Sequence, residues 1–240
     1  MTPTPISTVV SGARGTSVSA RARALLLVFL VATASLSIAC STGSSSADGA
    51  GDGRVVGYAP SPPPEVGRRS LPDHSNDPAG DPFPIRAATG DLLVVYFGFL
   101  SCPDICPLTM TDTAAGIADL PPAHADRIEV AFVTVDLERD TGPRLVDYLS
   151  HFFPDTTTHS LRAADTAQLD AVTTAFGVQW QVDPHEPGAT TYGVAHTGST
   201  YVVDDQGRVV WVIPFGTPGP DVAATLAHVL TTTYGTPSKR

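Results

Sequence analysis

Residues 92–99 (LLVVYFGF) form a run that carries no charged side chain. A run that is apolar at every position is typical of a strand covered on both faces, as in the sheets of α/β proteins. Two cysteines follow within a few residues, and a helical stretch then extends to about Leu120, before Pro121-Pro122. The sequence therefore predicts a buried central strand with a cysteine pair where that strand gives way to a helix.

The rest of the chain continues this alternation of strands and helices. The expected elements are a strand at 128–135, a helix at 143–153, a short strand region beginning at Leu161, a helix at 164–176, two strands at 200–203 and 209–213 joined by the turn Asp204-Asp-Gln-Gly207, and a closing helix at 220–231. This order predicts an α/β domain over residues 66–235, a thioredoxin-like fold with a mixed central sheet and flanking helices.

The N-terminal residues have the pattern of an export signal. Residues 24–39 are uncharged, follow Arg14, Arg21 and Arg23, and end in Ser37-Ile-Ala39 directly before Cys40. Sixteen such residues are short for a membrane span and suit a signal peptide. We expect residues 1–39 to be a lipoprotein-type signal and Cys40 to carry the lipid. The alternative is an uncleaved anchor with an incidental Cys40, and either arrangement places the rest of the chain on the extracytoplasmic face of the membrane.

Residues 40–65 are expected to be a flexible tether rich in Gly, Ser and Pro. Residues 41–53 contain no apolar residue larger than Ala, and residues 60–64 (PSPPP) form a stiffer spacer. If the chain starts at Cys40, three of its 14 basic residues are removed and the formal net charge becomes 11 − 24 = −13. A chain this acidic is not suited to binding nucleic acid.

Beyond Cys40, the only cysteines are Cys102 and Cys106. One pair four residues apart is not a disulfide scaffold, and so small a loop gains little stability from a cross-link. The helix N-terminus expected at the pair favours thiolate over thiol. The pair therefore suits chemistry, either a redox-active disulfide or a metal site, although a small structural disulfide is a further alternative.

Two thiolates leave a metal ion undercoordinated, so a third ligand has to come from a distant segment. Of the seven histidines, His196 is singled out because it falls just before the predicted strand at 200–203. In thioredoxin-like domains this approach lies beside the cysteine loop. Two sulfur ligands and an imidazole suit copper better than they suit hard cations, whereas a structural zinc site requires four ligands.

Three sequence blocks resemble the Sco/SenC family over about residues 66–233. They are Phe97-Gly-Phe-Leu-Ser-Cys102-Pro-Asp-Ile-Cys106-Pro, Val133-Thr-Val-Asp136-Leu-Glu-Arg139-Asp140-Thr, and His196-Thr-Gly-Ser-Thr-Tyr201-Val-Val-Asp204. The resemblance implies a thioredoxin-like fold and copper, as Cu(I) or Cu(II), held by Cys102, Cys106 and His196. Many family members have an acidic residue directly before the histidine, where this chain has Ala195.

The resemblance also implies a function, namely a copper metallochaperone for the binuclear copper site of cytochrome c oxidase. The expected partners are the oxidase subunit that holds this site, a possible copper donor protein, and the membrane through the lipid anchor. The alternative is a thiol–disulfide oxidoreductase in which Cys102 and Cys106 are catalytic and keep the acceptor cysteines reduced. The three-residue spacer between the cysteines and the presence of His196 favour the metallochaperone.

Overall fold

The structure is a computed structural model that describes residues 53–235. The predicted signal peptide, the predicted lipidation site Cys40 and the first half of the predicted flexible tether lie outside the described residues. Within residues 53–235, no helix is both long enough and apolar enough to cross a membrane.

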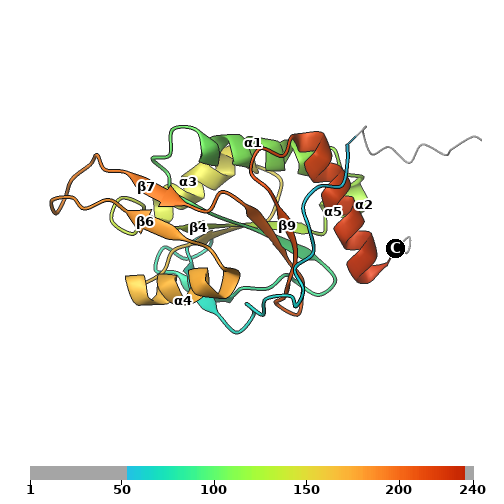
Figure 1. Cartoon of the computed structure of the whole chain (residues 1–240), viewed down its shortest axis with the longest axis horizontal. Coiled ribbons are helices and arrows are strands. Elements are labelled where there is room, and N and C mark those ends of the chain that lie inside the picture. Colours follow the sequence, from blue (N-terminus) through green and yellow to red (C-terminus); the bar gives the residue numbers. More distant parts are fainter. Residues whose placement is uncertain (1–52, 236–240) are drawn as a thin grey trace, which may run out of the picture. The chain divides into compact units, whose positions relative to one another are not determined.

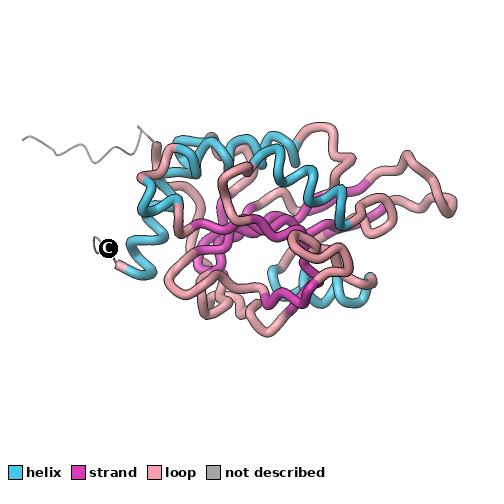
Figure 2. The backbone as a smooth tube through the Cα atoms, turned by 180° about the vertical axis from the view of Figure 1, so that it is seen from behind, coloured by secondary structure: helices cyan, strands magenta, loops and turns pink. Residues whose placement is uncertain are grey.

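A seven-stranded mixed sheet forms the centre of the domain (Figures 1 and 2). Strands β3, β4 and β5 are parallel to one another, whereas every other neighbouring pair is antiparallel. In spatial order the strands are β2 (Asp81–Pro84), β1 (Ser70–Asp73), β5 (Thr158–Leu161), β4 (Ile128–Thr134), β3 (Leu92–Gly98), β8 (Thr200–Val203) and β9 (Val209–Ile213). The predicted α/β class and mixed sheet are thus confirmed.

Helices cover both faces of this sheet (Figure 1). One apolar core is shared with α1 (Ile105–Ala118), α3 (Gly142–Phe152) and α5 (Gly219–Tyr234), and the other with α4 (Thr166–Phe176). Alternate residues of β3 enter the two cores, with Tyr96 on the first side and Phe97 on the second. This double burial explains why residues 92–98 are apolar without a break.

Several short elements differ from the sequence-based expectation. The strand expected to begin at Leu161 is β5, which ends there. Four further strands were not predicted, and a four-residue helix, α2 (Pro122–Ala125), follows the predicted stop at Pro121. These strands are only three or four residues long, and β2 contains two prolines, so they lack a clear apolar alternation.

Strands β6 (Trp180–Val182) and β7 (Val194–His196) form a separate antiparallel ribbon (Figure 1). The ribbon pairs Trp180 with His196, the last residue of β7. Residues 183–193 connect its two strands, and we call this connection the ribbon loop. The predicted approach to the hairpin therefore contains a strand of its own, and His196 lies at the end of it.

The segment before Val66 contacts the domain along β9. Tyr58 exchanges two backbone hydrogen bonds with Val212, of 3.1 and 2.9 Å, and the indole Nε1 of Trp211 donates to the carbonyl oxygen of Val56 at 2.8 Å. The amide of Val209 donates to the carbonyl of Pro64 at 2.9 Å. The sequence predicts a spacer for residues 60–64, but these contacts make the segment an added edge of the sheet.

Candidate metal centre

Three side chains that are distant in sequence converge at one end of the sheet. The Sγ atoms of Cys102 and Cys106 and a ring nitrogen of His196 all lie within 4.8 Å of one another. The Cys106 Sγ is 3.4 Å from His196 Nε2, although 90 residues separate the two. Among residues 53–235 this is the one group of three or more potential metal-ligating side chains with such spacing.

Cys106 lies in the first turn of α1 and is fully buried. The Tyr96 hydroxyl donates to its Sγ at 3.7 Å from the sheet below. The helix N-terminus was expected to favour thiolate, but at Cys106 burial outweighs it. Burial raises the pKa of the Cys106 thiol to about 12, because a thiolate without a counter-charge is poorly solvated there. The sulfur is therefore protonated at neutral pH until a cation or a redox partner replaces the proton.

Cys102 lies in the loop before α1 and is half-buried, so it is the sulfur on the solvent side of the pair. The backbone amide of Cys106 donates to its Sγ at 3.4 Å. Both cysteines are free thiols in the structure. Asp104, between them, precedes the first residue of α1, but its exposed side chain makes no capping hydrogen bond.

The ring of His196 is oriented by its backbone neighbour and by two aromatic rings. Its Nδ1 donates to the carbonyl oxygen of Thr197 at 3.1 Å, which leaves Nε2 as the unprotonated nitrogen that faces the sulfurs. Tyr96 and Phe99 meet the imidazole in edge arrangements, each with ring centroids 5.8 Å apart. Burial lowers the pKa of His196, so the imidazole is neutral and available as a ligand.

An open cavity of about 600 Å³ reaches His196 from the side of α4 and the ribbon. Ala195 also lines this cavity and is exposed. In an antiparallel ribbon, neighbouring side chains point to opposite faces, so Cβ of Ala195 faces away from the sulfurs. A side chain at position 195 therefore lies outside the group of the three proposed ligands.

Asp140, which follows strand β4, fixes the loop that carries Cys102. The side chain of Asp140, which is completely buried, accepts hydrogen bonds from the backbone amide of Leu100 at 3.0 Å and the Thr134 hydroxyl at 2.6 Å. Burial raises the pKa of Asp140. Asp140 thus fixes the cysteine loop two residues before Cys102. The sequence shows that Asp140 follows a buried strand, but it does not show that Asp140 binds the backbone amide of Leu100.

Comparisons with known proteins agree with this architecture. The family model described as SCO1/SenC matches residues 74–231. A SCO2-like protein of Rickettsia felis is 33% identical over 132 residues, which are 55% of this chain and 62% of that protein. The matched part thus spans less than two thirds of that relative.

Solved structures show the same fold. Apo Sco1 from Thermus thermophilus is 27% identical with a TM-score of 0.57, and the alignment covers 76% of this chain and 96% of that one. Bradyrhizobium japonicum ScoI, solved with copper bound, is 25% identical with a TM-score of 0.53, and the alignment covers 73% of this chain and 99% of that one. The fold is therefore the thioredoxin-like fold of Sco1 structures.

Proposed function

Because the chain belongs to the SCO1/SenC family, we propose that it binds one copper ion through Cys102, Cys106 and His196 and passes that ion to another protein. The observation that carries the proposal is the convergence of two sulfurs and one imidazole nitrogen within 4.8 Å. The copper-bound ScoI structure of Bradyrhizobium japonicum, at 25% identity, supports the choice of metal.

The donor set itself favours copper. Thiolate and imidazole ligands suit copper in both oxidation states, whereas hard cations prefer carboxylates and water. A structural zinc ion would take a fourth protein ligand, and within residues 53–235 the group contains three.

Burial differences suggest how copper is exchanged. Cys106 is fully buried and Cys102 is half-buried, so an incoming thiolate reaches the ion from the Cys102 side. Copper replaces the thiol protons on binding, and affinity therefore falls in acid. Release proceeds by the reverse exchange, in which acceptor thiolates replace Cys102 first and Cys106 last.

The proposed acceptor is the subunit of cytochrome c oxidase that holds the binuclear copper site. We propose that the domain works at the extracytoplasmic face of the membrane, held there by a lipid on Cys40, and that a separate protein donates the copper. The uncharged run before Cys40 supports this location.

A thiol–disulfide oxidoreductase is the second candidate, and the unequal burial of the two cysteines favours it. The Cys102 thiolate would attack a target disulfide and form a mixed disulfide, releasing one target thiolate. Cys106 would then displace the second target sulfur, leaving a reduced target and a Cys102–Cys106 disulfide. A dithiol donor protein would have to reduce that disulfide before the next cycle.

Anaerobic reconstitution of the purified protein with Cu(I) tests the first candidate. We expect one copper per chain, and greatly weakened binding in Cys102→Ala and in His196→Ala. The exposed His151 on α3 provides the control, because His151→Ala should bind copper normally. Unchanged binding in either ligand variant would refute the site, and full cellular function of His196→Ala would favour the oxidoreductase.

A further inference from the structure

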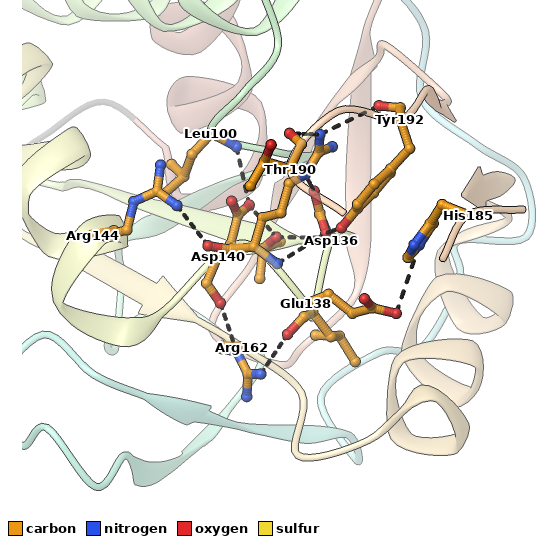
Figure 3. Close-up of polar contacts among 12 residues, drawn as sticks. Leu100, Asp136, Glu138, Asp140, Arg144, Arg162, His185, Thr190 and Tyr192 are labelled. Carbon is orange, nitrogen blue, oxygen red and sulfur yellow. Dashed lines mark hydrogen bonds and ion pairs between the residues drawn. The ribbon is translucent and has the colours of Figure 1, made fainter. Parts of the chain in front are cut away.

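Residues 136–140, which we call the acidic turn, contact both the segment that precedes Cys102 and the ribbon loop that precedes His196 (Figure 3). On the cysteine side, Asp140 binds the amide of Leu100, as described above. The guanidinium carbon of Arg139 also lies 5.8 Å from the centroid of the Phe99 ring. The turn thus holds the segment that leads directly into Cys102.

On the histidine side, the acidic turn contacts the ribbon loop through Tyr192. The Tyr192 hydroxyl donates to Asp136 Oδ1 at 2.6 Å, and Arg139 Nε donates to Asp136 Oδ2 at 2.5 Å. The guanidinium carbon of Arg139 lies 3.6 Å from the centroid of the Tyr192 ring. Arg139 Nη1 also donates to the backbone carbonyls of Tyr192 at 3.3 Å and Thr190 at 3.4 Å.

A second planar group stacks on the same tyrosine. The imidazole of His185 lies 3.8 Å from the Tyr192 ring centroid at an interplanar angle of 7°. Two planar groups that both lie within 4 Å of one ring centroid cannot share a face, so Tyr192 lies between His185 and Arg139. The imidazole of His185 also lies near the acidic turn, since its Nε2 is 3.7 Å from a carboxylate oxygen of Glu138.

The ribbon needs such external support. Strands β6 and β7 have three residues each and do not pair with the central sheet. A two-stranded ribbon of this length is marginal by itself. His196 is the last residue of β7, four residues after Tyr192, so whatever fixes Tyr192 also limits where the imidazole can go.

Building on the proposed copper site, we propose that Arg139 is a positioning residue, which clamps Tyr192 against Asp136 and thereby holds His196 in register with the two cysteines. Arg139 is the one side chain of the acidic turn that contacts both Phe99 on the cysteine side and Tyr192 on the histidine side. Its side chain is 12% exposed and that of Asp136 is 1% exposed, so solvent screens this ion pair little. Arg139 acts on copper only through the ligand that it places.

A double-mutant cycle on the full chain separates this role from general stabilisation. Cu(I) affinity is measured anaerobically by competition with a chromogenic chelator for wild type, Arg139→Gln, His196→Ala and the double variant. We expect Arg139→Gln to bind copper about 10- to 100-fold more weakly, as is usual when a group that orients a ligand is removed. In the His196→Ala background the same substitution should cause no further loss.

Arg127→Gln is the matched control. Arg127 also pairs with an aspartate (Asp91, 3.6 Å), donates to the Gly90 carbonyl and lies over an aromatic ring (Tyr234, 5.3 Å), but it contacts none of the proposed ligands. Arg127→Gln should lower stability and leave copper affinity unchanged. Arg139→Lys keeps the charge but loses the planar stack, so it should fall between wild type and Arg139→Gln. It also serves as the second variant should Arg139→Gln fail to fold.

X-ray absorption of the loaded variants gives a second readout, since the copper–nitrogen contribution should decrease in Arg139→Gln and stay intact in Arg127→Gln. The proposed positioning role of Arg139 is refuted if Arg139→Gln, or Arg139→Lys in its place, binds copper as wild type does. It is also refuted if the losses multiply in the double variant. Normal copper binding by His196→Ala would overturn the copper site itself and the clamp with it.

Discussion

The Tyr96 hydroxyl lies 3.7 Å from the Sγ of Cys106 and donates a hydrogen bond to it from within the central sheet. Tyr96 is completely buried and also meets the edge of the His196 ring. A hydrogen bond to a copper-bound sulfur draws electron density from it and stabilises the reduced metal. Tyr96 therefore influences the balance between Cu(I) and Cu(II) without being a ligand.

We predict that Tyr96→Phe shifts this balance toward Cu(II). The substitution keeps the ring and removes one hydrogen bond, so we expect a stability loss of about 1 kcal/mol or less. Potentiometric titration of the copper-loaded protein should give a lower reduction potential. Tyr148→Phe is the control, because the buried Tyr148 hydroxyl bonds to no group within residues 53–235. Equal potentials in wild type and Tyr96→Phe would contradict the prediction.

Gly98, the last residue of β3, leaves space for the buried sulfur. A Cβ atom at this position would lie 3.0 Å from Cys106 Sγ and 2.9 Å from ring carbons of Tyr96 and Phe132. Such contacts are too short for carbon, and the rings are fully buried, so the neighbours have little room to move. The glycine is therefore required by packing under the proposed copper site.

Gly98→Ala should lower the free energy of unfolding by about 1–3 kcal/mol, because overpacking forces the core apart. It should also weaken Cu(I) binding by displacing Cys106. Val95→Ala in the same strand provides the control, since Val95 faces the opposite core and its loss should destabilise the domain without changing copper affinity. Urea unfolding and chelator competition measure the two effects, and a fully stable Gly98→Ala variant would show that the core adapts.

The elements that the sequence predicts well are those whose residues are buried in a regular pattern. Strand β3 and the hairpin strands β8 and β9 appear at the expected residues, because continuous apolar runs and a turn with Gly207 leave few alternatives. The ribbon strand β7 was not predicted, since Val-Ala-His has no distinctive period and its stability depends on distant contacts.

The cysteine pair was predicted from its place between a strand and a helix, and His196 from its place before a strand together with the Sco/SenC resemblance. The structure brings the three side chains together. The clamp around Tyr192 was not found, because an arginine, a tyrosine and an aspartate in separate loops have no spacing rule that marks them as neighbours. Only the fold places Arg139 against Tyr192 across a separation of 53 residues. Sequence patterns thus identify ligands more readily than the groups that hold ligands in place.

Residues 53–65 should contribute to stability rather than act only as a spacer. A chain that begins at residue 66 loses the pairing of Tyr58 with Val212 and the bond from Trp211 to Val56. At about 1 kcal/mol for each lost hydrogen bond, we expect its free energy of unfolding to be about 2–4 kcal/mol lower than that of a chain that begins at residue 53. Trp211→Phe should account for about 1 kcal/mol of this. Urea unfolding of the three proteins tests the prediction, and equal stability of the two chain lengths would contradict it.

His159 on β5 lies between two carboxylates, away from the proposed copper site. Its Nδ1 is 2.7 Å from Asp73 Oδ2 and its Nε2 is 3.2 Å from Glu129 Oε2, while the ring stacks on Phe83 at 4.0 Å. Both nitrogens can donate to carboxylates only when the imidazole is protonated. Burial by itself would lower the pKa of His159, but the bonds to Asp73 and Glu129 outweigh it and raise the pKa to about 9.

This elevated pKa predicts a loss of stability as the pH rises. The imidazole binds its proton more tightly in the folded chain than in the unfolded chain, where the pKa is about 6.5. The stabilisation is therefore complete below about pH 6.5, decreases above it and is gone above about pH 9. It amounts to about 3 kcal/mol for a shift of this size. Urea unfolding at pH 6, 7.5 and 9 should show the free-energy difference between wild type and His159→Gln shrinking with pH, and a difference that stays constant would mean that His159 is neutral in the folded protein.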